Sequence, residues 1–205
     1  MGSVWVHAVV SLDGYIARQD DTVGPLFDWY FNGEVALAAN DGHPSFALSQ
    51  SSFDYTEPIW RRAGAQVIGR VLFDTTNGWN GVPVVGDRVF VVTHQPPADW
   101  VPSESLSADQ APFTFVDDVA EAIAQAKQVA GDRTVVLSAG EVAGQAVAAG
   151  LVDEVAIDLV PVFLGSGKRY LGSMTAEVLL EDPHVVVQGD RVLHLRHKVR
   201  GVPVG

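Results

Sequence analysis

The sequence predicts an α/β fold in which a mostly parallel central sheet is covered by helices and completed by antiparallel strands. Short apolar, β-branched segments alternate with amphipathic segments along most of the 205-residue chain, which is typical of strands joined by helices. Near the end, two extended segments at 185–188 and 192–199 are separated by Gly189 and Asp190, which predicts a hairpin. Without repeats or linkers, the chain is expected to form one domain over residues 1–205.

The first half of the chain begins with a nearly continuous apolar run at 4–10, which predicts a strand buried on both faces of a sheet. A turn at 11–14 and a short extended segment follow it. The secondary-structure signals in residues 32–50 are mixed, and we expect a helix over 34–39 followed by a loop. Another helix is expected to begin near Pro58, because proline is favoured in a first helical turn. A strand is then expected over 65–68.

The second half continues this alternation. After strands at 88–92 and 113–116, joined by a loop that reaches Pro112, an acidic cap precedes a helix with apolar residues at helical spacing. The strand at 135–137 leads into a helix near Glu141, with Gly150 just beyond the helix end. A long strand is expected over 155–163.

The composition excludes several classes of function. The net charge of −12 argues against a nucleic-acid or anionic-membrane partner. The chain has no cysteine, which excludes disulfides, thiolate metal sites and a cysteine nucleophile. His194 and His197 fall on opposite faces of a strand, so we expect no metal site there. The apolar start of the chain lacks the basic residues of a signal peptide, and we expect a cytoplasmic protein.

The junction at 135–141 is the centre of the predicted site. The small residues Ser138, Ala139 and Gly140 would let another molecule approach the backbone of the turn. The following helix would direct unpaired N–H groups and its positive dipole end toward that space, which suits a phosphate or pyrophosphate. Alternatively this is an ordinary strand-to-helix connection, in which the Glu141 carboxylate satisfies the helix end.

Two further strand ends share the same edge of a parallel sheet, where ligands of open α/β folds bind. Gly69 and Arg70 follow one strand, and Thr93 and His94 follow the next. Arg70 supplies a positive charge suited to a phosphate, or else forms a surface ion pair. Thr93 could hydrogen-bond a phosphate, and His94 could lie against an adenine. Together the three ends predict a phosphate-rich cofactor lying across the sheet.

Aromatic residues supply candidates for a substrate wall. Four of them occur in the five residues 27–31, where they would either plug a hydrophobic gap under a loop or stack against a planar heterocycle. Phe27 and Trp29 are the candidates in this segment. Trp79, in the glycine-rich loop 77–81, is the third candidate.

Several of these segments resemble those of a known family. These segments are SLDGYIA at 11–17, VIGR at 67–70, VVTH at 91–94, and the stretch from LVDE at 151–154 to PVFLGSG at 161–167. In this order they resemble the riboflavin-biosynthesis reductase domain, the C-terminal domain of the bifunctional deaminase-reductase, in the dihydrofolate reductase-like superfamily. The resemblance covers nearly the whole chain and implies the three-layer fold of that superfamily. In this family the turn after the central strand usually contains two adjacent glycines, whereas this chain has Ala139 and Gly140 there.

The resemblance also implies a site for NADPH. Gly69 and Arg70 would meet the 2′-phosphoadenosine side of the cofactor, with Thr93 and His94 nearby. Asp13 would lie near the reacting centre, where it would position the substrate or relay a proton; alternatively it forms an Asx turn with Gly14. The remaining implied cofactor contacts are Val71, Ser138 and Ala139, with Gly140, Glu141 and Val142 at the pyrophosphate and Leu164 and Gly165 at the nicotinamide.

The sequence therefore predicts an NADPH-dependent reductase that transfers hydride to a C=N or C=O carbon of a pyrimidine- or pterin-like substrate. Two alternatives remain open: dihydrofolate reductase-type activity on a folate, and an NADP-binding protein without catalysis. The alternating face of the last two strands, together with the resemblance, predicts a homodimer.

Overall fold

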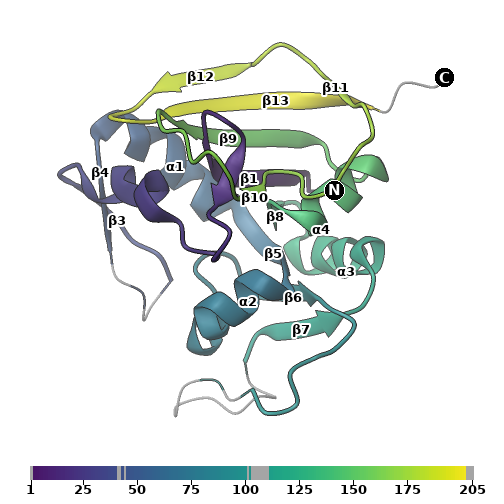
Figure 1. Ribbon diagram of the computed structural model, residues 1–205. Coiled ribbons are helices and arrows are strands. Elements are labelled where there is room, and N and C mark those ends of the chain that lie inside the picture. The colour runs from purple at the N-terminus through teal and green to yellow at the C-terminus, as the bar shows by residue number, and fades with distance from the viewer. Residues whose placement is uncertain (1, 41–42, 44, 101, 103–110, 202–205) are drawn as a thin grey trace.

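The computed structural model describes residues 2–40, 43, 45–100, 102 and 111–201, and has a large twisted sheet at its centre (Figure 1). Within these residues nine strands form this sheet. They are β1 Val4–Ser11, β5 Ala63–Gly69, β6 Arg88–Val92, β7 Phe113–Val116, β8 Thr134–Ser138, β9 Glu154–Val160, β11 Leu179–Leu180, β12 Val185–Gln188 and β13 Leu193–Gly201.

The strands lie in the order β11-β13-β9-β1-β8-β5-β6-β7, and β12 pairs with β13 outside this order. From β9 to β7 every neighbouring pair is parallel. The strand β13 runs antiparallel to β9, β11 and β12. The predicted fold class, a mostly parallel sheet with antiparallel C-terminal strands, is therefore confirmed.

Helices cover both faces of the sheet (Figure 1). One face packs against α3 Val119–Ala130 and α4 Glu141–Ala148, which bury Val4 and Val6 of β1. Because successive side chains of a strand point to opposite faces, Trp5, His7 and Val9 of β1 point to the other face. That face carries α1 Gln50–Arg62, α2 Arg70–Thr76 and the 3₁₀ helix η1 Gly24–Phe31.

The predicted ends of several elements are confirmed. Asp118 caps α3 by accepting a hydrogen bond from the Glu121 amide at 2.8 Å, and the helix ends at Gly131. Gly150 follows α4 with a left-handed φ of 69°, which favours glycine. The C-terminal hairpin closes through the Gly189 amide, 2.9 Å from the Val192 carbonyl oxygen.

The predicted helix over 34–39 is wrong. These residues instead contribute β3 Val35–Leu37, which pairs antiparallel with β4 Phe46–Leu48. Leu37 and Leu48 are buried beside the aromatic residues of η1. The segment alternates between half-buried, exposed and buried side chains, and its packing under η1 outweighs the weak local helix signal.

Two element boundaries also differ from the prediction. The helix expected near Pro58 begins earlier, at Gln50, because Ser49 caps it by accepting a hydrogen bond from the Ser52 amide at 3.4 Å. Pro58 therefore lies inside α1. The strand expected over 155–163 ends at Val160, since Pro161 cannot donate to the ladder.

The short strands β2 Tyr15–Ala17 and β10 Lys168–Arg169 form an antiparallel pair. The loop predicted at 77–81 is the turn η2 Asn77–Gly81, in which Trp79 has a positive φ. Much of the loop predicted up to Pro112, at 101 and 103–110, lies outside the described residues. No helix in the described ranges has the length and apolar character needed to cross a membrane.

We expect Gly144→Ala to destabilise the fold, although alanine is the better helix former by about 1 kcal/mol. A Cβ at Gly144 of α4 would lie 2.2 Å from the Leu171 carbonyl oxygen, so the helix would have to move. We expect the free energy of unfolding to fall by about 1–3 kcal/mol in urea denaturation followed by circular dichroism. Ala148→Ser, which adds one atom on the exposed face of α4, should stay within about 0.5 kcal/mol of the wild type. A Gly144→Ala protein more stable than the wild type would contradict this packing.

Candidate functional site

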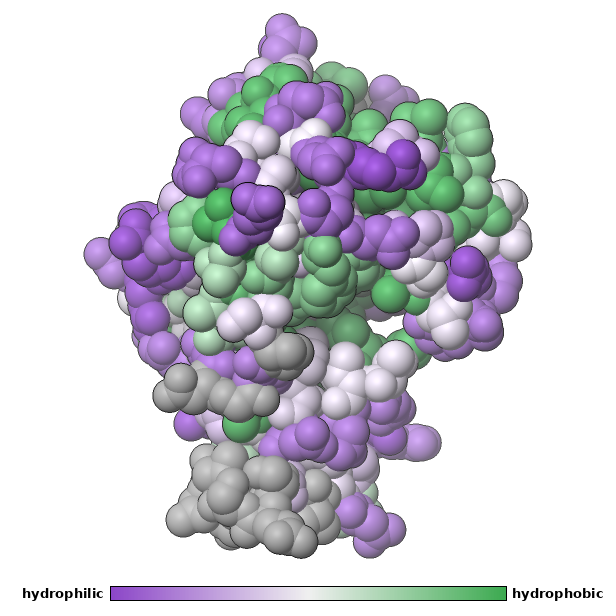
Figure 2. All heavy atoms as spheres, turned by 90° about the vertical axis from the view of Figure 1, so that its left-hand side faces the viewer, coloured by the Kyte–Doolittle hydropathy of each residue, from purple (hydrophilic) through white to green (hydrophobic). Residues whose placement is uncertain are grey.

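A cavity of about 1290 Å³ opens on the sheet face that carries α1 and α2. Its sheet side includes His7 of β1, Gln66 of β5 and Val136 of β8. It extends to the carboxyl ends of β5, β6 and β8, where open α/β sheets bind ligands. In Figure 2, hydrophobic residues come to the surface between hydrophilic ones where this side of the molecule is hollowed.

The structure brings most of the predicted cofactor residues to this cavity. Those that line it come from the ends of β5, β6 and β8 and the starts of α2 and α4. They are Gly69, Arg70, Val71, Thr93, His94, Ser138, Ala139, Gly140, Glu141 and Val142. Leu164 and Gly165 are not among the described residues that line it.

The start of α4 has the features of an anion site. Gly140 has a φ of 108°, and a Cβ there would meet only the tip of Ile16, at 3.8 Å, so the backbone is open to a ligand. The amides of Glu141, Val142 and Ala143 have no hydrogen-bond partner among the described residues. The carboxylate of Glu141 does not cap the helix, because it accepts a hydrogen bond from the Ser173 hydroxyl at 2.7 Å. These amides fit the pyrophosphate of a dinucleotide.

Arg70 joins two of the strand ends. Its Nε donates to Asp74 at 2.7 Å, and its guanidinium also donates to the Gln95 carbonyl oxygen. The Thr93 hydroxyl also bonds to the backbone of Gln95, accepting from its amide at 3.2 Å. The expected ion pair is therefore present, and Arg70 still lines the cavity with a third of its side chain exposed.

The charges around the cavity are mixed. Lys168 and Arg169 of β10 add positive charge to that of Arg70. The acidic residues that line the cavity are Asp21, Asp117, Asp118 and Glu141. Asp118 is held at the start of α3 as its cap, so its carboxylate is already engaged.

The Asp13 carboxylate is held by hydrogen bonds within the protein. It accepts hydrogen bonds from the Gly165 amide at 2.7 Å, the Leu164 amide at 3.1 Å and the Ser11 hydroxyl at 2.5 Å. The Ser11 hydroxyl and, more weakly, the two amides lower the pKa of Asp13. The Asx turn is not formed, because the Ser11 carbonyl oxygen and hydroxyl accept from the amides of Gly14 and Tyr15. Asp13 thus ties the end of β1 to the loop after β9.

Two of the three aromatic candidates for the substrate wall line the cavity, and the third is buried in the core. Phe27 and Trp79 line the cavity, as a wall requires. Trp29 is only 1% exposed and packs in the core between Tyr30 and His194, so its assignment to the substrate wall is wrong. Sequence reasoning did not single out Tyr30 of the same segment and missed Phe46 and Trp60, all of which line the cavity.

A buried hydrogen-bonded cluster beside the cavity was also missed. Nε2 of His7 lies 2.9 Å from one carboxylate oxygen of Asp158, and Nδ1 of His194 lies 2.7 Å from the other. Nε2 of His194 lies 3.0 Å from the Ser52 hydroxyl. Burial alone would raise the pKa of Asp158, but the attraction of His7 and the hydrogen bonds from both histidines outweigh it and lower this pKa to about 2.

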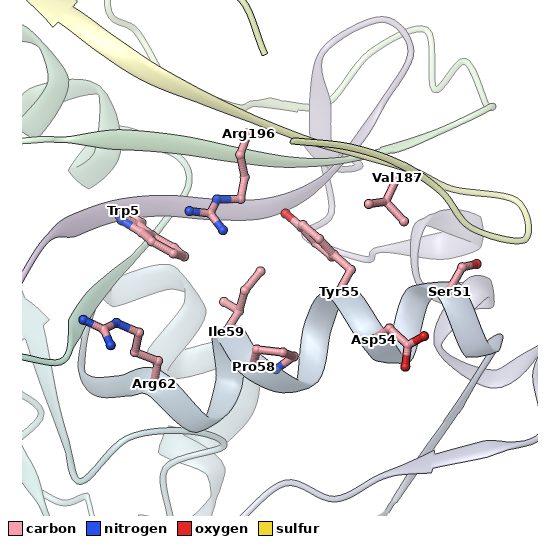
Figure 3. Close-up of a pocket in the computed structure, with 9 residues that line it drawn as sticks. All are labelled: Trp5, Ser51, Asp54, Tyr55, Pro58, Ile59, Arg62, Val187 and Arg196. Atoms are coloured by element: carbon pink, nitrogen blue, oxygen red, sulfur yellow. The ribbon is translucent and has the colours of Figure 1, made fainter. Parts of the chain in front are cut away.

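A second, smaller hollow of about 500 Å³ lies between α1 and the strands β1, β12 and β13 (Figure 3). The Arg196 guanidinium lies 4.0 Å from the centre of the Trp5 ring there. Tyr55 of α1 borders this hollow and stacks on His194, with ring centres 4.3 Å apart. Its ring therefore lies between this hollow and the buried cluster.

Comparison with solved structures shows the same fold. A protein from Shewanella sp. PV-4 named for riboflavin biosynthesis matches with a TM-score of 0.64 at 18% identity, over 98% of this chain and 99% of that one. A diaminohydroxyphosphoribosylaminopyrimidine deaminase/5-amino-6-(5-phosphoribosylamino)uracil reductase from Thermotoga maritima matches with a TM-score of 0.58 at 13% identity, over 97% of this chain and 56% of that one.

Dihydrofolate reductase from Enterococcus faecalis, solved with NADP(H), matches with a TM-score of 0.53 at 14% identity, over 97% of both chains. No protein of curated function matches the sequence significantly. The sequence model of the RibD C-terminal domain matches residues 3–194, nearly the whole chain. The chain therefore belongs to the RibD C-terminal domain family.

Proposed function

We propose that this protein is an NADPH-dependent reductase that transfers hydride to a C=N or C=O carbon of a pyrimidine- or pterin-like substrate. Membership of the RibD C-terminal domain family supports an oxidoreductase. Similarity in fold to a 5-amino-6-(5-phosphoribosylamino)uracil reductase and to an NADP(H)-bound dihydrofolate reductase supports the cofactor and the substrate class.

The observation that carries the proposal is the open start of α4 on the large cavity. Its unpartnered amides and the uncrowded Gly140 fit a pyrophosphate. Arg70 and His94 lie along the same edge of the sheet, where they would meet the 2′-phosphoadenosine end of the cofactor. When bound, NADPH supplies the hydride, and the chain binds, orients and shields the reacting groups.

The wall of the cavity suits a planar, nitrogen-rich substrate. Phe27, Tyr30 and Trp60 provide aromatic surface for stacking. The side-chain oxygen of Gln66 is buried without a hydrogen-bond partner. Since unsatisfied acceptors are costly, this oxygen would be stabilised by an N–H group such as those of a pyrimidine or pterin ring.

Asp13 acts in this proposal by holding a loop. Its carboxylate fixes the amides of Leu164 and Gly165, and this loop would then line the nicotinamide side of the site once cofactor is bound.

The proposed assembly is a homodimer. Val186 of β12 is 58% exposed on the outer strand of the sheet, and Leu179 and Leu180 of β11 are also exposed, so this edge offers apolar surface to a second copy.

We expect NADPH to quench the tryptophan fluorescence of the protein with a micromolar dissociation constant. Arg70→Ala should weaken NADPH binding by about 1–3 kcal/mol, because a charge-assisted contact to phosphate is lost. NADH, which lacks the 2′-phosphate, should be affected less by this substitution. Titration of the wild type and the variant with both nucleotides measures these differences.

Arg61→Ala is a matched control for this titration. Arg61 forms the same kind of pair, with Glu57 four residues earlier on α1, at 3.5 Å, and does not line the cavity. Its loss should leave both affinities unchanged.

Failure of the wild type to bind either nucleotide would contradict the proposed function. Nucleotide binding without turnover of 5-amino-6-(5-phosphoribosylamino)uracil or dihydrofolate would favour a non-catalytic protein, and turnover of dihydrofolate alone would favour the folate alternative.

We expect Asp13→Asn to lower kcat at least tenfold while changing the affinity for NADPH far less. An amide presents only one oxygen to the two amides of Leu164 and Gly165, and its NH₂ group would face a donor. Steady-state kinetics and the fluorescence titration provide the two values. Unchanged turnover would show that the Asp13 clamp has no part in the reaction.

A further inference from the structure

The buried cluster around Asp158 fixes one histidine at the edge of the large cavity. Asp158 and His194 are fully buried, whereas the His7 side chain is 10% exposed and lines the cavity. In the strand pairing, His7 lies opposite Ser138, directly before the turn that starts α4. His7 is therefore next to the place where the cofactor is expected to bind.

The charge on Asp158 determines which histidine nitrogens of this cluster carry protons. With a pKa lowered to about 2, Asp158 is an ionised carboxylate at neutral pH, and a carboxylate only accepts hydrogen bonds. Nε2 of His7 and Nδ1 of His194 must therefore both carry protons. Nδ1 of His7 has no hydrogen-bond partner among the described residues, so it is the nitrogen left to serve a ligand.

Three tyrosines and His194 near the cluster are less suited to this role. Burial and the Asp158 charge raise the pKa of Tyr30 on η1, of Tyr55 on α1 and of Tyr170 after β10, so all three stay neutral. His194 is bonded on both ring nitrogens, to Asp158 and to Ser52. The other charged or titratable residues that line the cavity are Asp21, Arg70, His94, Asp117, Asp118, Glu141, Lys168 and Arg169.

We propose that His7 is the catalytic acid of the reductase, donating a proton from Nδ1 to the nitrogen or oxygen of the bond that is reduced. Asp158 is a positioning residue, which holds the His7 ring in the required tautomer and stabilises its protonated form. His194 and Ser52 in turn hold Asp158. This inference rests on the proposed function.

The step balances with NADPH as the reductant. The substrate carbon gains a C–H bond from the hydride of the reduced nicotinamide, which is oxidised to NADP⁺. The π electron pair of the C=N or C=O bond moves to nitrogen or oxygen, which takes the proton from His7. The neutral imidazole then regains a proton from water. The net reaction consumes one NADPH and one proton for each double bond reduced.

The first test uses kinetics with 5-amino-6-(5-phosphoribosylamino)uracil and NADPH. We expect His7→Gln to lower kcat by about 10²- to 10⁴-fold, as for loss of a general acid. Its Kd for NADPH should change less than about threefold, since the ring serves the substrate. The fall in kcat at high pH, where the imidazolium is lost, should be absent from the variant. Imidazole added to His7→Ala should restore part of the activity.

His197→Gln is the matched control, because His197 lies on the neighbouring part of the sheet, bonded to the Glu181 carbonyl oxygen and away from the cavity. It should keep the wild-type kcat and pH profile. A His7→Gln protein that keeps the wild-type kcat and pH profile would overturn the assignment of His7. Thermal unfolding of each variant shows whether a loss of activity reflects a loss of fold.

The second test needs no turnover. In protein labelled with ¹³C-histidine, addition of NADP⁺ should shift the ring signals of His7, identified by their loss in His7→Gln, and leave those of His197 unchanged. Saturation with NADP⁺ without any change at His7 would overturn the inference while leaving the cofactor proposal intact. No binding of NADP⁺ or NADPH would instead overturn the proposed function, and the inference with it.

Discussion

The arrangement of this protein depends on one buried negative charge. Asp158 lies in the middle of β9 with no exposure to solvent, and an unpaired carboxylate there would cost several kcal/mol. Histidines from both neighbouring strands satisfy it, His7 from β1 and His194 from β13, and Ser52 connects His194 to α1. The same contacts therefore hold together the parallel part of the sheet, its antiparallel end and one covering helix, while placing an imidazole on the cavity.

A second set of hydrogen bonds holds the turn after β1. The Asp13 carboxylate binds the backbone of the loop after β9 through two amides, so the turn after β1 and this loop keep a fixed separation. Together with the open start of α4, these contacts leave space for a ligand where three parallel strands end. The polar groups that organise the site come from strand ends, from the interior of β1 and β9, from β13 and from α1.

Much of the fold could be predicted from the sequence, because its strands and later helices carry strong local signals. Asp118, Gly131 and Gly189 mark boundaries that the structure confirms. The segment 34–39 and the start of α1 could not be placed, since packing under η1 and the Ser49 cap decide them. In the site, the backbone turns were identified, but His7 was not. A charged residue inside an apolar strand, Asp158, was the available signal, and its partners are distant in sequence.

A crystal structure of the protein with NADP⁺ would test the account most directly. We expect the pyrophosphate to accept hydrogen bonds from the Glu141 and Val142 amides, the adenosine phosphate to lie near Arg70, and the nicotinamide ring to lie beside His7. Nucleotide bound elsewhere, for example in the hollow between α1 and β13, or a nicotinamide far from His7, would contradict the account.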